Sequence, residues 1–123
     1  MKYHLALCRT AVKHHQLSKR AFAHIFHKPN TICVAPEFVD LPETYQAGIL
    51  LHELGHAASS AGDEPYSHSE HDADRAAFEI SGIVIRRRTY RGAKNLEVIA
   101  SEDLAPASRF LHDMIDMHLK GVK

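Results

Sequence analysis

The sequence contains no tryptophan, two cysteines and no long apolar run, and these shortages exclude several classes of protein. Cys8 and Cys33 are too few for a disulfide framework and form no Cys-x-x-Cys pair, as expected in a reducing compartment. The longest purely apolar stretch, Ala47 to Leu51, is far shorter than the roughly 20 residues of a membrane-spanning helix. The polar N-terminus does not resemble a signal peptide. We therefore expect a cytoplasmic protein without membrane insertion.

An excess of charge of one sign is also lacking, because 15 Lys and Arg residues balance 15 Asp and Glu residues. A chain without net charge has no overall electrostatic attraction for nucleic acid or for an anionic membrane. Apolar residues make up 45% of the chain and charged residues 24%, which is typical of a folded globular protein. A length of 123 residues suits one hydrophobic core, so we expect a single domain over residues 1–123.

The spacing of apolar residues predicts an α+β chain with a small mixed sheet and flanking helices. Helical spacings of three and four recur near both ends, and segments rich in β-branched residues lie between turn residues elsewhere. The segment 21–26 fits either a strand or an extension of the first helix. The expected order is a helix over 3–17, strands over 21–26 and 31–34 around a turn at Pro29 and Asn30, two central helices, a hairpin from 83–85 and 96–99, and a helix from Phe110 to about Leu119.

The two central helices have the clearest boundaries. Tyr45 begins a run without proline that extends to about Ser60 and carries a broad apolar face. A cap at Ser67 or Ser69 begins the second helix, which ends at Gly82. This second helix is short and rich in alanine, so it is suited to close packing against another helix.

The first central helix carries His52-Glu53-Leu54-Gly55-His56, an H-E-x-x-H pattern. Residues four apart lie about 40° apart around a helix, so both imidazoles project from one face and can share a metal ion. Glu53 lies about 100° from His52, where its carboxylate can hydrogen-bond a water on the metal instead of ligating. With 11 histidines in the chain, about 0.06 accidental matches are expected, and the competing interpretation is a pair of solvated histidines.

Gly55 strengthens the interpretation of the motif. A glycine within a strong helix costs about 1 kcal/mol against alanine, so its presence there calls for a structural reason. We expect that it allows another element to approach closely beside the face that carries the histidines.

A catalytic zinc site usually has three protein ligands and leaves a fourth position to water, so a third ligand is needed. Glu70 and Asp74 are four apart and share a helix face, which allows Glu70 to ligate while Asp74 accepts the second ring N–H of a ligand histidine. His71 and Asp72 point about 100° and 200° away from Glu70 around the helix. His68 is the main rival, because it also follows the turn and would complete a site of three imidazoles.

The two motifs together, H-E-L-G-H from His52 and E-x-x-x-D-R-x-A from Glu70, resemble those of the gluzincin metallopeptidases. Within that group they are most similar to the HtpX and CAAX-prenyl peptidases and to the ImmA/IrrE group. The resemblance covers about residues 45–82. Two features depart from the family pattern: Asp72 stands where glutamate is usual, and only 13 residues separate His56 from Glu70.

The resemblance implies a minimal zincin-like fold, with a small mixed sheet packed on the helix that bears the H-E-x-x-H motif. It implies one zinc ion (Zn²⁺) per chain, held by His52, His56 and Glu70, with Asp74 as the hydrogen-bond partner of a ligand histidine. It also implies a polypeptide substrate held extended along a strand at the sheet edge, here Thr31 to Val34.

Three further residues are candidates to steady the tetrahedral oxyanion, as a tyrosine or histidine often does in zincin sites. They are Tyr66, His68 and Tyr90, and the plainer interpretation of each is an ordinary surface residue. Cys33 has no histidine or asparagine partner at a nucleophile's spacing, so we expect it to be a small buried apolar residue.

Arg86 to Arg91, with Lys94, form the only basic run. A strand there sends alternate arginines to opposite faces. One interpretation is a binding site for an acidic or phosphate-bearing partner, and the default is a solvated hairpin.

These residues together predict a zinc-dependent metallopeptidase, in which zinc lowers the pKa of its water and Glu53 moves the proton to the leaving amine. The competing hypothesis is a zincin-like regulatory or binding module, with structural zinc and little or no peptidase activity. The small size of the chain favours the module, since little of it is left to wall a substrate cleft. Glu53 favours the enzyme, because a structural zinc site is usually closed by four ligands and needs no base.

Overall fold

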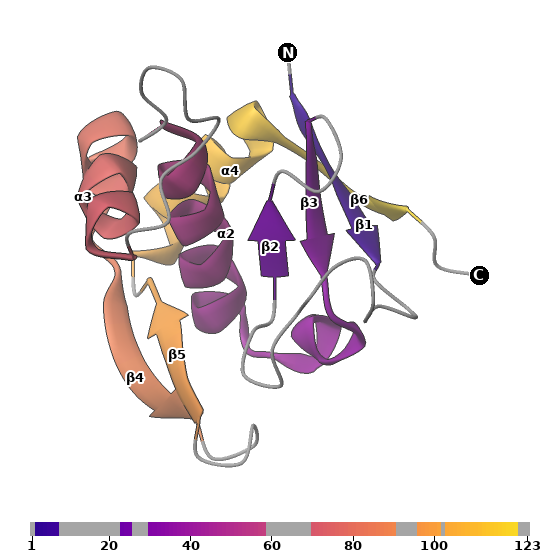
Figure 1. The fold of residues 1–123 in the computed structure, drawn as a ribbon, viewed down its shortest axis with the longest axis horizontal. Helices are drawn as coiled ribbons and strands as arrows, with labels where there is room; N and C mark the ends of the chain where they lie inside the picture. Colours follow the sequence, from indigo (N-terminus) through magenta and orange to yellow (C-terminus); the bar gives the residue numbers. More distant parts are fainter. Residues whose placement is uncertain are drawn as a thin grey trace.

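A four-stranded mixed sheet packed against the helix that bears His52 and His56 forms the centre of the fold (Figure 1). The structure is a computed structural model that describes residues 2–7, 23–25, 30–58, 70–90, 96–101 and 103–120. This α+β arrangement confirms the predicted fold class. No helix in the described ranges is long and apolar enough to cross a membrane. The elements are β1 (Tyr3–Leu7), β2 (Ala23–Ile25), β3 (Thr31–Val34), the 3-10 helix η1 (Pro36–Asp40), α2 (Glu43–Ala58), α3 (Glu70–Ser81), β4 (Arg86–Tyr90), β5 (Leu96–Ala100), α4 (Leu104–Met114) and β6 (Ile115–Lys120).

The four-stranded sheet has the order β2-β3-β1-β6 and joins segments from both ends of the chain. Strand β1 runs parallel to β3 on one side and to β6 on the other. The helix predicted over residues 3–17 is therefore wrong for residues 3–7, and residues 8–17 lie outside the described part. Leu5 is the buried residue of β1. Five residues with one buried position at their centre fit a strand as well as a helix, and the pairing of β1 with β3 and β6 selects the strand.

Strand β3 lies in the interior of the sheet, between β2 and β1. The expectation that Thr31 to Val34 form the sheet edge is therefore wrong, because both backbone edges of this segment are paired. The residues from Ile32 to Val34 are fully buried or nearly so, and the burial of Cys33 agrees with the expected small apolar residue. Among the described strands, β2 is the outermost on one side of the sheet and β6 on the other.

The two predicted hairpins are present. Strand β2 pairs antiparallel with β3, so the segment 21–26, which fitted either a strand or a helix, is a strand over its described residues Ala23–Ile25. Asn30 has a φ of 53°, a left-handed conformation suited to a turn. In the second hairpin, β4 begins at Arg86, so the predicted strand at residues 83–85 lies outside the ladder. Of the apolar run before this ladder, Ile83 is buried, Ile85 is partly buried and Val84 is exposed.

The C-terminal helix is shorter than predicted. Helix α4 ends at Met114, and Ile115 begins β6 with an extended backbone. The predicted continuation of the helix to about Leu119 is therefore wrong. The physical reason is the available edge of β1, which pairs with β6 through a bulge between His4 and Leu5.

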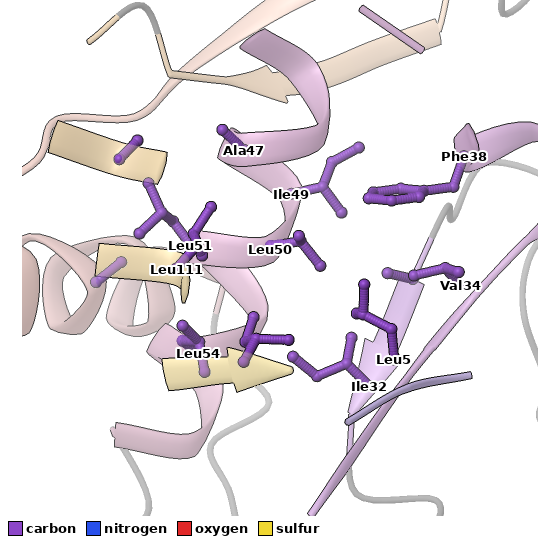
Figure 2. Close-up of a cluster of buried hydrophobic side chains, with 14 of the residues drawn as sticks. Leu5, Ile32, Val34, Phe38, Ala47, Ile49, Leu50, Leu51, Leu54 and Leu111 are labelled. Carbon is purple, nitrogen blue, oxygen red and sulfur yellow. The ribbon is translucent and has the colours of Figure 1, made fainter. Parts of the chain in front are cut away.

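Helix α2 is buried all round, instead of along one face. Its nine consecutive residues from Ala47 to Gly55 are all buried. Figure 2 shows Leu50 pointing toward Val34 and Leu5 on the sheet, whereas Leu51 points toward Leu111 of α4. The helix predicted from Tyr45 to about Ser60 is confirmed, with its first turn at Glu43 and its described part ending at Ala58.

Two polar contacts position the start of α2. The side-chain amide of Gln46 donates to the carbonyl oxygens of Leu41 at 3.0 Å and Phe38 at 3.2 Å, which ties α2 to η1. The backbone N–H of Ser101, just after β5, donates to the carbonyl oxygen of Thr44 at 2.8 Å. These contacts fix the start of α2 to the η1 segment and to the end of the β4–β5 hairpin.

Helices α2 and α3 cross at Gly55 with almost no space between them. A Cβ atom on Gly55 would overlap the carbonyl oxygen of Ala73, and would lie 2.8 Å from the carbonyl carbon of Ala73 and 3.2 Å from the Cβ of Ala77. Ala73 and Ala77 are themselves completely buried. The expected close approach of another element at Gly55 is confirmed, and that element is α3.

The substitution Gly55→Ala tests this crossing. Alanine improves helix propensity by about 1 kcal/mol, yet we expect the free energy of unfolding to fall by roughly 1–3 kcal/mol, because the backbone of α3 must move. Urea denaturation measures the change. Ala58→Gly, at the exposed end of α2, is the control and should cost no more than about 1 kcal/mol. A Gly55→Ala protein as stable as the wild type would contradict the close crossing.

Candidate metal centre

The H-E-x-x-H residues form a compact group of metal-binding atoms. One ligand atom from each of His52, Glu53 and His56 lies within 4.8 Å of the other two. This is the only group of its kind that the described residues contain. The spacing along α2 brings His56 near both other residues, because His52 lies four positions before it and Glu53 three.

The two histidine rings are neighbours on one side of α2. Their centroids lie 4.7 Å apart and their planes meet at 83°, an edge-to-face arrangement. The side chain of His52 is 4% exposed, whereas that of His56 is only partly buried. The site is thus closed on the side of His52 and more accessible on the side of His56.

Glu53 is buried with His52, at 7% exposure. A carboxylate is rarely buried so deeply without polar partners, since transfer out of water is costly for a charged group. The histidine nitrogens next to it supply a polar environment. Sequence analysis placed this carboxylate beside the histidines, but it did not predict that the helix would be buried on every side.

His52 is held by a residue of α3. Its Nδ1 lies 2.7 Å from Oδ1 of Asp74, a short contact in which the ring N–H donates to the carboxylate. Because Nδ1 is engaged in this way, Nε2 is the ring nitrogen placed to ligate a metal. Asp74 therefore has the geometry that the sequence analysis required of a partner for a ligand histidine, while its role at a bound metal stays a prediction.

The helix crossing explains why Asp74 reaches His52. Ala73 and Ala77 pack on Gly55, and Asp74 follows Ala73 directly, so its side chain emerges beside the contact with α2. The far end of α3 is closed by Gly82, whose φ of 73° allows its N–H to donate to the carbonyl oxygen of Phe78 at 2.7 Å. The predicted end of this helix is confirmed.

The remaining predicted site residues are described only in part. Glu70 is the first residue of α3, one helical turn before Asp74, and its side chain lies outside the described part of the structure, as does that of His71. Asp72 is exposed on α3. His68 and Tyr66 fall within the undescribed residues 59–69, and the side chain of Tyr90 is also outside the description.

The group of donors could hold a metal ion. Imidazole nitrogens and carboxylate oxygens are both common metal ligands in proteins. A carboxylate on the outer nitrogen of a ligand histidine frequently accompanies such sites, and the His52–Asp74 contact has this geometry.

Sequence analysis missed the packing partners that build the site. Ala73 and Ala77 decide where Asp74 lies, and they were recognised only as part of an alanine-rich helix. Their spacing of four, on the helix that follows a glycine-containing helix, is the signal that would have paired them with Gly55. Comparison of the chain with protein-family models, curated proteins and solved structures found no match.

The contact between His52 and Asp74 makes a prediction about stability. Asp74→Ala leaves the buried Nδ1 of His52 without its carboxylate, and we expect the chelator-treated protein to lose about 1–3 kcal/mol of unfolding free energy. Denaturant titration provides the measurement. Asp113→Ala, at an exposed position of α4, should change it by no more than about 0.5 kcal/mol. Equal stabilities for the two variants would show that the His52 contact does not support the fold.

Proposed function

We propose that this protein is a zinc-dependent metallopeptidase that hydrolyses peptide bonds. The observation that carries the proposal is the group of His52, Glu53 and His56 with Asp74 on the outer nitrogen of His52. A buried carboxylate beside two histidines on one helix is the arrangement that metal-assisted hydrolysis needs. The proposal is an H-E-x-x-H enzyme of the gluzincin type.

One zinc ion per chain would be held by His52, His56 and Glu70. The first two belong to the convergent group on α2, and the third begins α3, one turn before the residue that contacts His52. The crossing at Gly55 packs α3 against α2, which supports the first turn of α3 as the proposed source of the third ligand. This set leaves a position for water and substrate, which a catalytic site requires.

Bound zinc would supply a Lewis acid that polarises the scissile carbonyl and makes a water molecule acidic near neutral pH. Glu53 acts as the general base: its carboxylate accepts a proton from the attacking water and passes it to the leaving amine. Asp74 keeps the ring of His52 in one tautomer and orientation through the 2.7 Å contact. The burial of Glu53 keeps competing water away from the proton it carries.

The substrate is proposed to be a polypeptide in an extended conformation. Strand β2 ends the sheet on the side that packs against α2 (Figure 1), so this edge lies next to the helix that carries the metal-binding group. A sheet edge offers backbone N–H and C=O groups to which an extended peptide can pair. We therefore propose Ala23–Ile25 as the strand along which the substrate pairs, because β3 is interior to the sheet.

Metal content tests the ligand set. We expect one equivalent of zinc per chain by elemental analysis, and a loss of that zinc in His56→Ala and in Glu70→Ala, because each removes a ligand. Glu79→Ala is the matched control, since Glu79 is an exposed glutamate on the same helix as Glu70. Asp74→Ala should retain zinc with affinity lower by roughly 10- to 100-fold. Full zinc in Glu70→Ala would refute Glu70 as the third ligand.

Peptide cleavage tests the enzyme itself. Glu53→Gln keeps the shape of the side chain and all three proposed ligands, so zinc content and thermal stability should stay unchanged. An amide cannot act as the base, and chelator-sensitive cleavage of a mixed peptide library should fall by about 10²- to 10⁴-fold. Glu79→Gln should cleave as the wild type does.

Two results would contradict the proposal. Undiminished cleavage by Glu53→Gln would mean that Glu53 is not the base. If the wild-type protein holds a full equivalent of zinc and cleaves no peptide, the protein is a binding module with a structural metal and not a peptidase.

A further inference from the structure

The outer strand of the small hairpin, β4, has a backbone edge that faces away from the other described helices and strands. Strands β4 and β5 form a two-stranded antiparallel sheet, and β5 is the strand that packs against α2. Figure 1 places β4 on the side of β5 away from α2. Among the described strands β4 pairs only with β5, so alternate backbone N–H and C=O groups of β4 point outward.

This edge carries the strongest local charge in the sequence. Arg86, Arg87 and Arg88 are consecutive in β4, and Arg91 and Lys94 follow in the chain, with no acidic residue before Glu97. Successive positions of a strand belong to opposite faces, so the three consecutive arginines occupy positions of both faces of β4. Arg86 is exposed. The chain as a whole has no net charge, and the basic strand is therefore a local feature.

An extended acidic peptide matches both properties of this edge. Its backbone can complete the outward hydrogen-bonding groups of β4, and its carboxylates can pair with arginines on either face. Nucleic acid would use the charges alone and would leave the backbone groups of β4 to water.

We propose that β4 is a docking edge for an acidic peptide segment, which adds to the β4–β5 sheet as a third strand. The arginines also prevent the edge from pairing with a second copy of itself, because like charges would then lie opposite one another. The partner is thus selected by charge and held by backbone hydrogen bonds. This surface is distinct from the metal-binding group on α2 and from the β2 edge.

A direct test is fluorescence anisotropy of the full chain with a labelled octapeptide in which glutamate alternates with valine. We expect saturable binding that a chelator leaves unchanged, since the metal-binding group takes no part. The same peptide with N-methylated amides keeps its carboxylates but cannot donate backbone hydrogen bonds, and it should bind at least about 10-fold more weakly. This arm uses only the wild-type protein, so it does not depend on the folding of a variant.

The variant arm is Arg86→Gln with Arg88→Gln, which should raise the Kd for the acidic peptide by roughly 3- to 30-fold. Arg75→Gln with Arg109→Gln is the matched control, because it removes two exposed arginines from α3 and α4, and its Kd should stay within about twofold of the wild type.

Four results would overturn the proposal. They are no saturable binding of the acidic peptide, equal binding of its N-methylated form, loss of binding on addition of chelator, and tighter binding of a labelled oligothymidylate than of the peptide. The last result would assign the arginine strand to nucleic acid.

Discussion

The crossing of α2 and α3 at Gly55 is the constraint on which the candidate site depends. The absence of a side chain at this position lets the carbonyl of Ala73 and the methyl group of Ala77 rest against the backbone of α2. At that separation Asp74 reaches Nδ1 of His52 at 2.7 Å. Any larger side chain at Gly55 would separate the helices and move the carboxylate away from the ring. Glycine at this position is unfavourable for α2 alone, but it sets how closely α2 and α3 pack.

Burial gives the polar group on α2 its chemical character. His52 and Glu53 lie within a run of nine buried residues, in contact with a core that extends from the sheet to α4 (Figure 2). Polar groups in such surroundings are costly unless each has a partner, and the structure pairs His52 with a carboxylate. The same surroundings strengthen electrostatic interactions inside the site, which is useful where charge develops in a reaction.

The two sheets pack against α2 in different ways. The four-stranded sheet supports one side of the helix and presents β2 as its near edge, whereas the β4–β5 hairpin packs through β5 and presents β4 outward. Interior strand β3 is buried from Ile32 to Val34, and these residues pair with β1 on one side and β2 on the other, so β3 serves the core. Of the described sheet edges, β2 lies beside the helix that carries the metal-binding group and β4 carries the consecutive arginines.

The sequence by itself determined the features that depend on the spacing of residues within one helix. The four-residue spacing of His52 and His56 places both rings on one side of any helix that forms there, and Gly55 marked the close approach of another element. The tertiary structure decided the features that depend on distant partners. Tyr3–Leu7 is a strand because β3 and β6 pair with it, β3 is interior because β1 lies beside it, and Ile115 leaves the helix because β1 offers an edge. Segments of five or six residues contain too few apolar positions to select between helix and strand, so hydrogen bonds to residues far along the chain make that choice.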